Sequence, residues 1–132
     1  MTMTKSMGDE SSLEATTAAD GLTAAACLFH GFSDPARIAI LQHLALGEHR
    51  VVDLRGHLGL AQSTVSQHLA CLRDCGLVTS RPQGRATFYS LADAEALTDL
   101  WAAAERLLDL TGHRVVLCAD HGAEALARKG WS

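Results

Sequence analysis

The chain has 132 residues, of which 48% are hydrophobic, and a formal charge of −4. This length supports one ordinary domain with its own core, and no apolar run approaches the roughly 18 residues that a membrane span needs. The polar N-terminus has no secretory pattern, so we expect a cytoplasmic protein with no membrane partner, in which cysteines stay reduced.

The charge is unevenly distributed along the chain. Between residues 50 and 85 there are five arginines and only two aspartates, whereas acidic residues dominate both flanks. A basic middle between acidic flanks favours a local phosphate-binding surface over a wholly basic protein.

The N-terminal part predicts a flexible arm at residues 1–11 and then a helix. The Ala-rich stretch 12–32 contains good helix formers, and Gly31 ends it. Cys27 lies on the apolar side of this helix, so we expect it to be a core residue.

A second helix is predicted after this glycine. Ser33 or Asp34 can cap it, Pro35 fits its first turn, and Gly47 closes it. The inward side chains of this helix are aliphatic, which is typical of a buried face.

The middle of the chain predicts a helix-turn-helix motif. A short helical pattern at residues 51–57 is broken at Gly59, and a longer helix runs from residue 61 to Gly76. The second helix exposes short polar side chains that suit base edges and phosphates. These candidate DNA-binding residues are Gln62, Ser63, Thr64, Ser66, Gln67 and His68.

A β-hairpin is predicted directly after the recognition helix. Two β-prone runs, 77–81 and 85–91, flank a turn at residues 82–84. A hairpin in this position is a wing, and Arg81 and Arg85 at its tip would reach the DNA backbone or the minor groove.

Residues 93–110 predict an amphipathic helix with a wide apolar face. Its width suggests a dimer interface, with the helix at residues 12–32 as a second contributor. The expected fold is therefore mainly α with a small β-hairpin, a dimeric winged helix-turn-helix domain at residues 12–112, followed by a tail at residues 113–132. The predicted face consists of Leu97, Leu100, Trp101, Ala104, Leu107 and Leu108.

Cys71 and Cys75 lie one helical turn apart inside the predicted recognition helix. The i, i+4 spacing puts both sulfurs on one face, close enough to hold one ion. A metal bound there would act on the element that binds DNA, so the pattern indicates a metal-responsive transcription factor. The alternative is that both are small buried hydrophobes.

Two further functions remain as alternatives. A thiol redox or persulfide sensor would use Cys71 with Cys75 or Cys118, although an i, i+4 helical pair is poorly placed for a disulfide. An enzyme with a nucleophilic cysteine has no supporting His-Cys-Asp arrangement, phosphate loop or cofactor motif in the sequence. We therefore do not expect an enzyme.

Several segments together resemble the ArsR/SmtB family of bacterial metal-sensing repressors, over about residues 25–112. The resemblance implies a homodimeric winged helix-turn-helix repressor that releases operator DNA when an effector binds. Two metal sites used elsewhere in the family are missing, because Glu95 and Arg106 stand where a zinc-type site has histidines, and no Cys-x-Cys precedes the recognition helix. The matching segments are Asp34-Pro-Ala-Arg37-Ile-Ala-Ile-Leu41, Ser63-Thr-Val-Ser-Gln-His-Leu69, Leu77-Val and Gly84-Arg85-Ala-Thr-Phe-Tyr89-Ser-Leu91.

The cysteine pair is similar to that of the cadmium- and lead-sensing branch of this family. That branch completes its site with a cysteine from the C-terminal region of the other subunit, for which Cys118 is the candidate here. The resemblance thus implies the metal ligands Cys71, Cys75 and Cys118, a soft site suited to Cd(II), Pb(II) or Zn(II). A fourth ligand is left open between Asp120, His121, Cys27 and His30.

The remaining histidines have no partner at ligand spacing. We expect them to be surface or hydrogen-bonded polar residues, whereas His68 is assigned to the DNA-binding set. This group consists of His30, His43, His49, His57 and His113.

Overall fold

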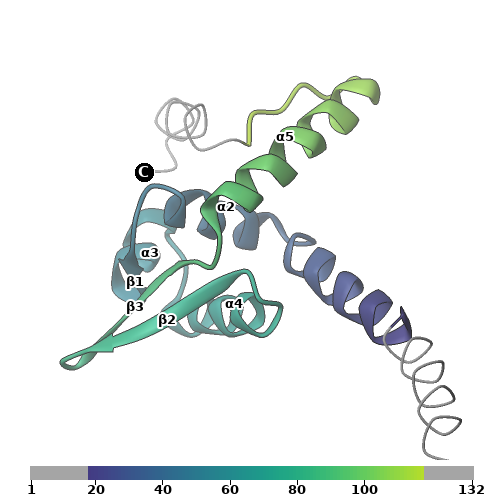
Figure 1. Ribbon diagram of the computed structural model, residues 1–132. Helices are drawn as coiled ribbons and strands as arrows, with labels where there is room; N and C mark the ends of the chain where they lie inside the picture. The colour runs from purple at the N-terminus through teal and green to yellow at the C-terminus, as the bar shows by residue number, and fades with distance from the viewer. Residues whose placement is uncertain (1–17, 118–132) are drawn as a thin grey trace, which may run out of the picture.

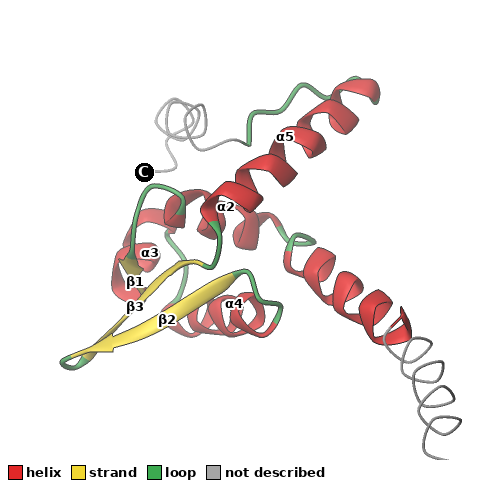
Figure 2. Cartoon of the chain, viewed as in Figure 1, coloured by secondary structure: helices red, strands yellow, loops and turns green. Residues whose placement is uncertain are grey.

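The computed structural model describes residues 18–117 and is mostly helical, with one small antiparallel sheet (Figure 2). An N-terminal helix, described over residues 18–31, precedes the labelled elements. These elements are α2 (Pro35–Leu44), β1 (His49–Arg50), α3 (Val51–Leu58), α4 (Gln62–Asp74), β2 (Val78–Gln83), β3 (Ala86–Leu91) and α5 (Ala94–Leu110). No helix among the described residues is long and apolar enough to cross a membrane. The predicted arm at residues 1–11 lies outside the described residues.

The predicted start of α2 and the predicted end of α3 are confirmed, whereas α2 ends at Leu44, with Ala45 as its C-cap, before the predicted stop at Gly47. The Asp34 carboxylate caps α2 by accepting a hydrogen bond of 2.7 Å from the Ala36 N–H, and Pro35 occupies the first turn. Gly59 ends α3 with a φ of 67°, a left-handed conformation that glycine adopts without strain. The chain can therefore turn sharply from α3 into α4, which gives the helix-turn-helix.

The sheet has three strands rather than the two of the predicted hairpin. β3 is central, with β2 on one side and the two-residue strand β1 on the other. β2 also runs further than expected, through Pro82 and Gln83, so the turn lies at Gly84 and Arg85 instead of residues 82–84. Because β2 is an edge strand, Pro82 can occupy it without removing an interior ladder bond. The β2–β3 hairpin extends away from the helices as a wing (Figure 1).

One hydrophobic core joins the helix-turn-helix to α5. The inward side chains of α4, Val65, Leu69 and Leu72, have no exposed surface. α5 contributes Leu97 and Trp101 to the same core. The outer part of the predicted α5 face stays exposed, because 66% of Leu107 is accessible to solvent.

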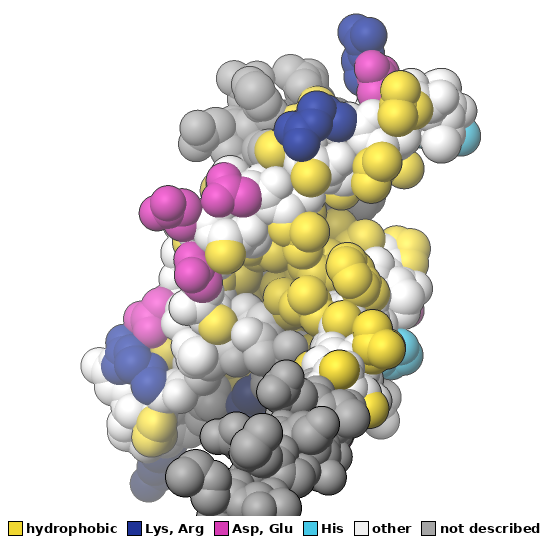
Figure 3. Space-filling model, turned by 45° about the vertical axis from the view of Figure 1, so that its right-hand side comes forward, with side chains coloured by type: hydrophobic (Ala, Val, Ile, Leu, Met, Phe, Trp, Pro, Cys, Tyr) yellow, Lys and Arg dark blue, Asp and Glu magenta, His cyan; other side chains and the backbone are white. Residues whose placement is uncertain are grey.

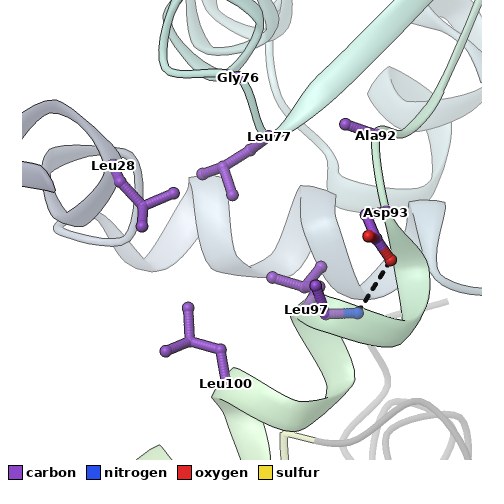
Figure 4. A pocket seen from close by; sticks show the side chains of 8 residues that line it. Leu28, Gly76, Leu77, Ala92, Asp93, Leu97 and Leu100 are labelled. Atoms are coloured by element: carbon purple, nitrogen blue, oxygen red, sulfur yellow. Dashed lines mark hydrogen bonds between the residues drawn. The ribbon is translucent and has the colours of Figure 1, made fainter. Parts of the chain in front are cut away.

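The N-terminal helix lies against the C-terminal end of α4 and the start of α5. Leu28 and Leu77 point toward each other across an apolar hollow that Leu97 and Leu100 also line (Figure 4). Gly31 allows the close approach, since a Cβ there would lie 2.7 Å from Leu77 Cδ1 and 3.8 Å from Cys75 Cβ. The last turn of this helix is therefore held beside the end of the recognition helix.

Candidate DNA-binding surface and thiol cluster

The predicted DNA-binding residues lie on the outer face of α4. The side chains of Gln62, Ser63, Ser66 and Gln67 are exposed, while Thr64 and His68 are partly buried. These side chains face outward because the opposite face of α4 is buried in the core. α4 can thus present a row of hydrogen-bonding side chains to a groove without moving its backbone.

His68 is positioned by a neighbour inside the fold as well as by α4. Its Nδ1 lies 3.4 Å from Nη1 of Arg37, which is itself buried. The histidine therefore connects the outer surface of α4 to α2.

The two arginines of the wing have different surroundings. Arg85 is exposed in the turn at the hairpin tip. Arg81 lies within β2, where it donates two hydrogen bonds of 2.8 Å to the Glu48 carboxylate and stacks 5.0 Å above the Phe88 ring. The Arg81 guanidinium holds the pKa of Glu48 below its ordinary value, mainly through these hydrogen bonds. Arg81 therefore ties the wing to the segment before β1, and Arg85 is the arginine at the tip.

Three cysteines meet where the N-terminal helix passes the end of α4. Cys27 Sγ lies 2.8 Å from Cys75 Sγ, although the residues are 48 positions apart. Cys71, one turn before Cys75, also interacts with the Cys75 thiol. Burial, with contributions from Cys27 and Cys71, raises the pKa of Cys75 to about 12. The prediction that Cys27 is a core residue is wrong: it is only partly buried and belongs to this thiol cluster.

The donor set of the thiol cluster, which consists of Cys27, Cys71 and Cys75, suits a soft metal ion. Sulfurs that share a tetrahedral Zn(II) lie about 3.8 Å apart, given a Zn–S bond of about 2.3 Å. The Cys27–Cys75 contact is shorter than this, and no group of three potential ligands among residues 18–117 is already arranged to hold an ion. The chemistry of the three thiols suits a soft ion, and binding one would require their side chains to move.

Of the other ligand candidates, only His30 lies within the described residues. Cys118, Asp120 and His121 lie outside the described part of the chain. His30 is exposed, and its main-chain carbonyl accepts a hydrogen bond from Arg37.

Three histidines form a group that sequence spacing did not predict. The rings of His43, His49 and His57 have centroids 5.1 to 6.1 Å apart, and they come from α2, β1 and α3. His43 is buried, and His49 Nδ1 contacts the Gly47 carbonyl oxygen at 2.7 Å. The only available signal was their common position at the ends of short elements, which does not predict a contact.

Comparison with known proteins identifies the family. Residues 34–80 match the family described as "Bacterial regulatory protein, arsR family". The transcriptional regulator CmtR of Mycobacterium tuberculosis is 46% identical over 81 residues, which cover 59% of this chain and 69% of that protein. A protein of Streptomyces lividans named "Probable mercury resistance operon repressor" is 40% identical over 95 residues, which cover 72% of this chain and 67% of that protein.

A solved structure gives the same result for the fold. The homodimeric winged helix-turn-helix DNA-binding domain of a Mycobacterium bovis protein matches with a TM-score of 0.63 and 27% identity, covering 74% of this chain and 92% of that chain. The helix-turn-helix and wing described above therefore have the arrangement of a winged helix-turn-helix domain. The relatives are regulators of transcription rather than enzymes. From the sequence match and the fold together, this chain belongs to the arsR family of bacterial regulatory proteins.

Proposed function

We propose that this protein is a transcriptional repressor that binds operator DNA as a homodimer and releases it when a soft metal ion binds thiolates of the recognition helix. The observation that carries the proposal is the position of Cys71 and Cys75 on α4. The N-terminal part of that helix exposes Gln62, Ser63, Ser66 and Gln67. The thiols and the DNA-facing side chains thus share one rigid element.

The ion would be held by Cys71 and Cys75 together with Cys118, which we propose comes from the other subunit. When bound, a soft ion supplies strong bonds to sulfur that thiol contacts alone do not provide. Cd(II), Pb(II) and Zn(II) are the effectors proposed. The name of the Streptomyces relative refers to mercury, another thiophilic metal.

The proposed release of DNA follows from the position of the thiols at the end of α4. Cys75 is the C-cap of α4, so a bond there constrains the end of the helix while its start contacts DNA. Two recognition helices in a dimer must match half-sites about 34 Å apart, so a small reorientation weakens both contacts. A coupling of about 1–3 kcal/mol would lower DNA affinity by about 5- to 150-fold.

The dimer is proposed to form through an apolar face on the N-terminal helix and α5. Figure 3 shows hydrophobic side chains gathered between α5 and the lower part of the molecule. Leu22, Phe29, Leu107 and Leu110 are large, apolar and exposed on these two helices. Phe29 and Leu107 line one apolar hollow between the two helices. Exposed apolar surface of this kind is typical of protein interfaces, and the related Mycobacterium bovis domain is homodimeric.

A charge placed on this face should separate the subunits. We expect Leu107→Glu to weaken dimerisation by roughly tenfold or more, since burying an unpaired carboxylate in an apolar interface costs more than the roughly 1.4 kcal/mol that a tenfold change represents. Sedimentation equilibrium over a concentration series measures the change. Leu46→Glu is the matched control, because Leu46 is also exposed but follows α2. Equal dimerisation of both variants would show that this face does not form the dimer interface.

The experiment that tests the function combines DNA release with metal binding. A double-stranded oligonucleotide selected by the metal-free protein from a random pool is labelled, and its fluorescence anisotropy is followed during Cd(II) addition to reduced protein. We expect release with the wild type and none with Cys71→Ser, which should still bind DNA. Mg(II) serves as the control ion, because it prefers oxygen ligands. Equal release with Cys71→Ser, or none with the wild type, would contradict the proposal.

A further inference from the structure

The N-terminal helix brings a thiol to the recognition helix from the same subunit. Cys27 Sγ lies 2.8 Å from Cys75 Sγ, a close approach of two thiols that belong to different helices. The contact joins two separate helices, unlike the pair Cys71 and Cys75 on α4 itself. The approach therefore depends on how the two helices pack.

That packing is fixed by groups other than the sulfurs. Gly31 fits against Leu77 and Leu72, where a Cβ would lie 2.7 and 3.5 Å from their methyl carbons. Arg37 donates hydrogen bonds to the carbonyls of His30 and Gly31 at the end of the N-terminal helix. Cys27, one turn before this point, is thus held next to α4 by steric fit and hydrogen bonding.

We infer that Cys27 is a metal ligand together with Cys71 and Cys75, so that one ion fastens the N-terminal helix to the recognition helix within a single subunit. The inference rests on the proposed function and extends it. Three sulfurs of one subunit then form a site without a residue from the partner. Cys118 becomes an additional ligand rather than a required one.

This arrangement links metal binding to two surfaces at once. The N-terminal helix carries exposed Leu22 and Phe29 on the proposed dimer face, and α4 carries the DNA-facing residues. An ion shared by Cys27 and the α4 thiols fixes the orientation of one helix relative to the other. DNA release therefore follows from a change inside each subunit that the dimer face transmits to its partner.

The test is a Cd(II) titration of the reduced full-length protein, read by sulfur-to-metal charge-transfer absorption. For Cys27→Ser we expect absorption per bound ion to fall by about a quarter to a third, because one thiolate is lost from three, or from four when Cys118 also binds. The affinity should fall roughly tenfold or more, since even outer-shell changes have effects of that size. Ala26→Ser is the matched control, an exposed neighbour on the same helix that should behave as wild type. Cys118→Ser should keep the Cys27-dependent signal.

A second measurement does not depend on absorption. Alkylation followed by peptide mass spectrometry should show that Cd(II) protects Cys27 in the wild type but not in a Cys71→Ser, Cys75→Ser double variant. If Cys27→Ser titrates as wild type and Cd(II) does not protect Cys27 in the wild-type protein, while Cys71→Ser loses binding, the inference is overturned and the proposed function is left intact. If Cys71→Ser also titrates as wild type, the proposed function fails as well. A Cys27–Cys75 disulfide found in the metal-free protein under reducing conditions would also overturn the inference.

Discussion

Replacing Trp101 by alanine is expected to lower the free energy of unfolding by about 3–5 kcal/mol, the usual cost of truncating a buried Trp. Only 2% of Trp101 is exposed, and it shares the core with Ile40 and Leu97. Its removal leaves a cavity where α5 meets α2, and a domain of this size has only about 5–15 kcal/mol of stability. Urea unfolding followed by far-ultraviolet circular dichroism measures the loss.

Two further variants make the Trp101 result interpretable. Leu110→Ala removes a large apolar side chain from the same helix, but 84% of Leu110 is exposed, so we expect a change within about 0.5 kcal/mol. Trp101→Phe keeps much of the apolar volume and should retain a measurable transition if the alanine variant does not fold. Similar losses in Trp101→Ala and Leu110→Ala would show that α5 is not anchored through Trp101.

The features predicted correctly are those that depend on neighbouring residues. The Asp34 cap followed by Pro35 and the glycine turn at Gly59 are local signals, because the same few residues make the hydrogen bonds. The buried face of α4 follows from helical periodicity, which assigns Val65 and Leu69 to one side. The pattern therefore predicted the helix-turn-helix and the orientation of its second helix.

The features that could not be predicted from the sequence depend on pairings between distant segments. β1 has only two residues, His49 and Arg50, and exists because β3 provides hydrogen-bonding partners. Arg81 was assigned to DNA because arginine commonly binds phosphate, but its guanidinium pairs with Glu48, which is 33 positions away in the sequence. Periodicity shows which face a side chain occupies and not which element covers that face.

The thiol cluster depends both on a local sequence signal and on a contact between distant segments. The spacing of Cys71 and Cys75 was visible, since both lie within one turn at the end of α4. Cys27 was assigned to the core because it occupies the apolar side of its helix. The apolar side is correct, but the surface it meets contains Cys75, which only the packing of Gly31 against α4 determines.

Arg37 is expected to be the residue whose loss most disturbs the junction between the N-terminal helix and the helix-turn-helix. It is buried, and its guanidinium donates to the carbonyl oxygens of Gly31 at 3.2 Å and His30 at 2.8 Å. It also donates to Ser33 Oγ at 3.0 Å. The last carbonyls of a helix have no partner within it. Arg37 donates to two of them, of which the His30 carbonyl also accepts from the N–H and the hydroxyl of Ser33.

We expect Arg37→Met to lower the free energy of unfolding by about 3 kcal/mol, because hydrogen bonds to a charged group contribute about 1.5–3 kcal/mol each and the apolar stem is retained. Arg37→Lys should recover only part of the loss, since an ammonium cannot reproduce the planar fork that reaches both carbonyls. Urea unfolding gives the stability, and amide hydrogen exchange over residues 18–31 shows whether the helix detaches. Exchange that rises only there would mean that Arg37 sets the position of Cys27, and Cd(II) affinity should then fall although every thiol is present. Unchanged exchange and stability in Arg37→Met would show that Gly31 and its apolar contacts hold the junction without the guanidinium.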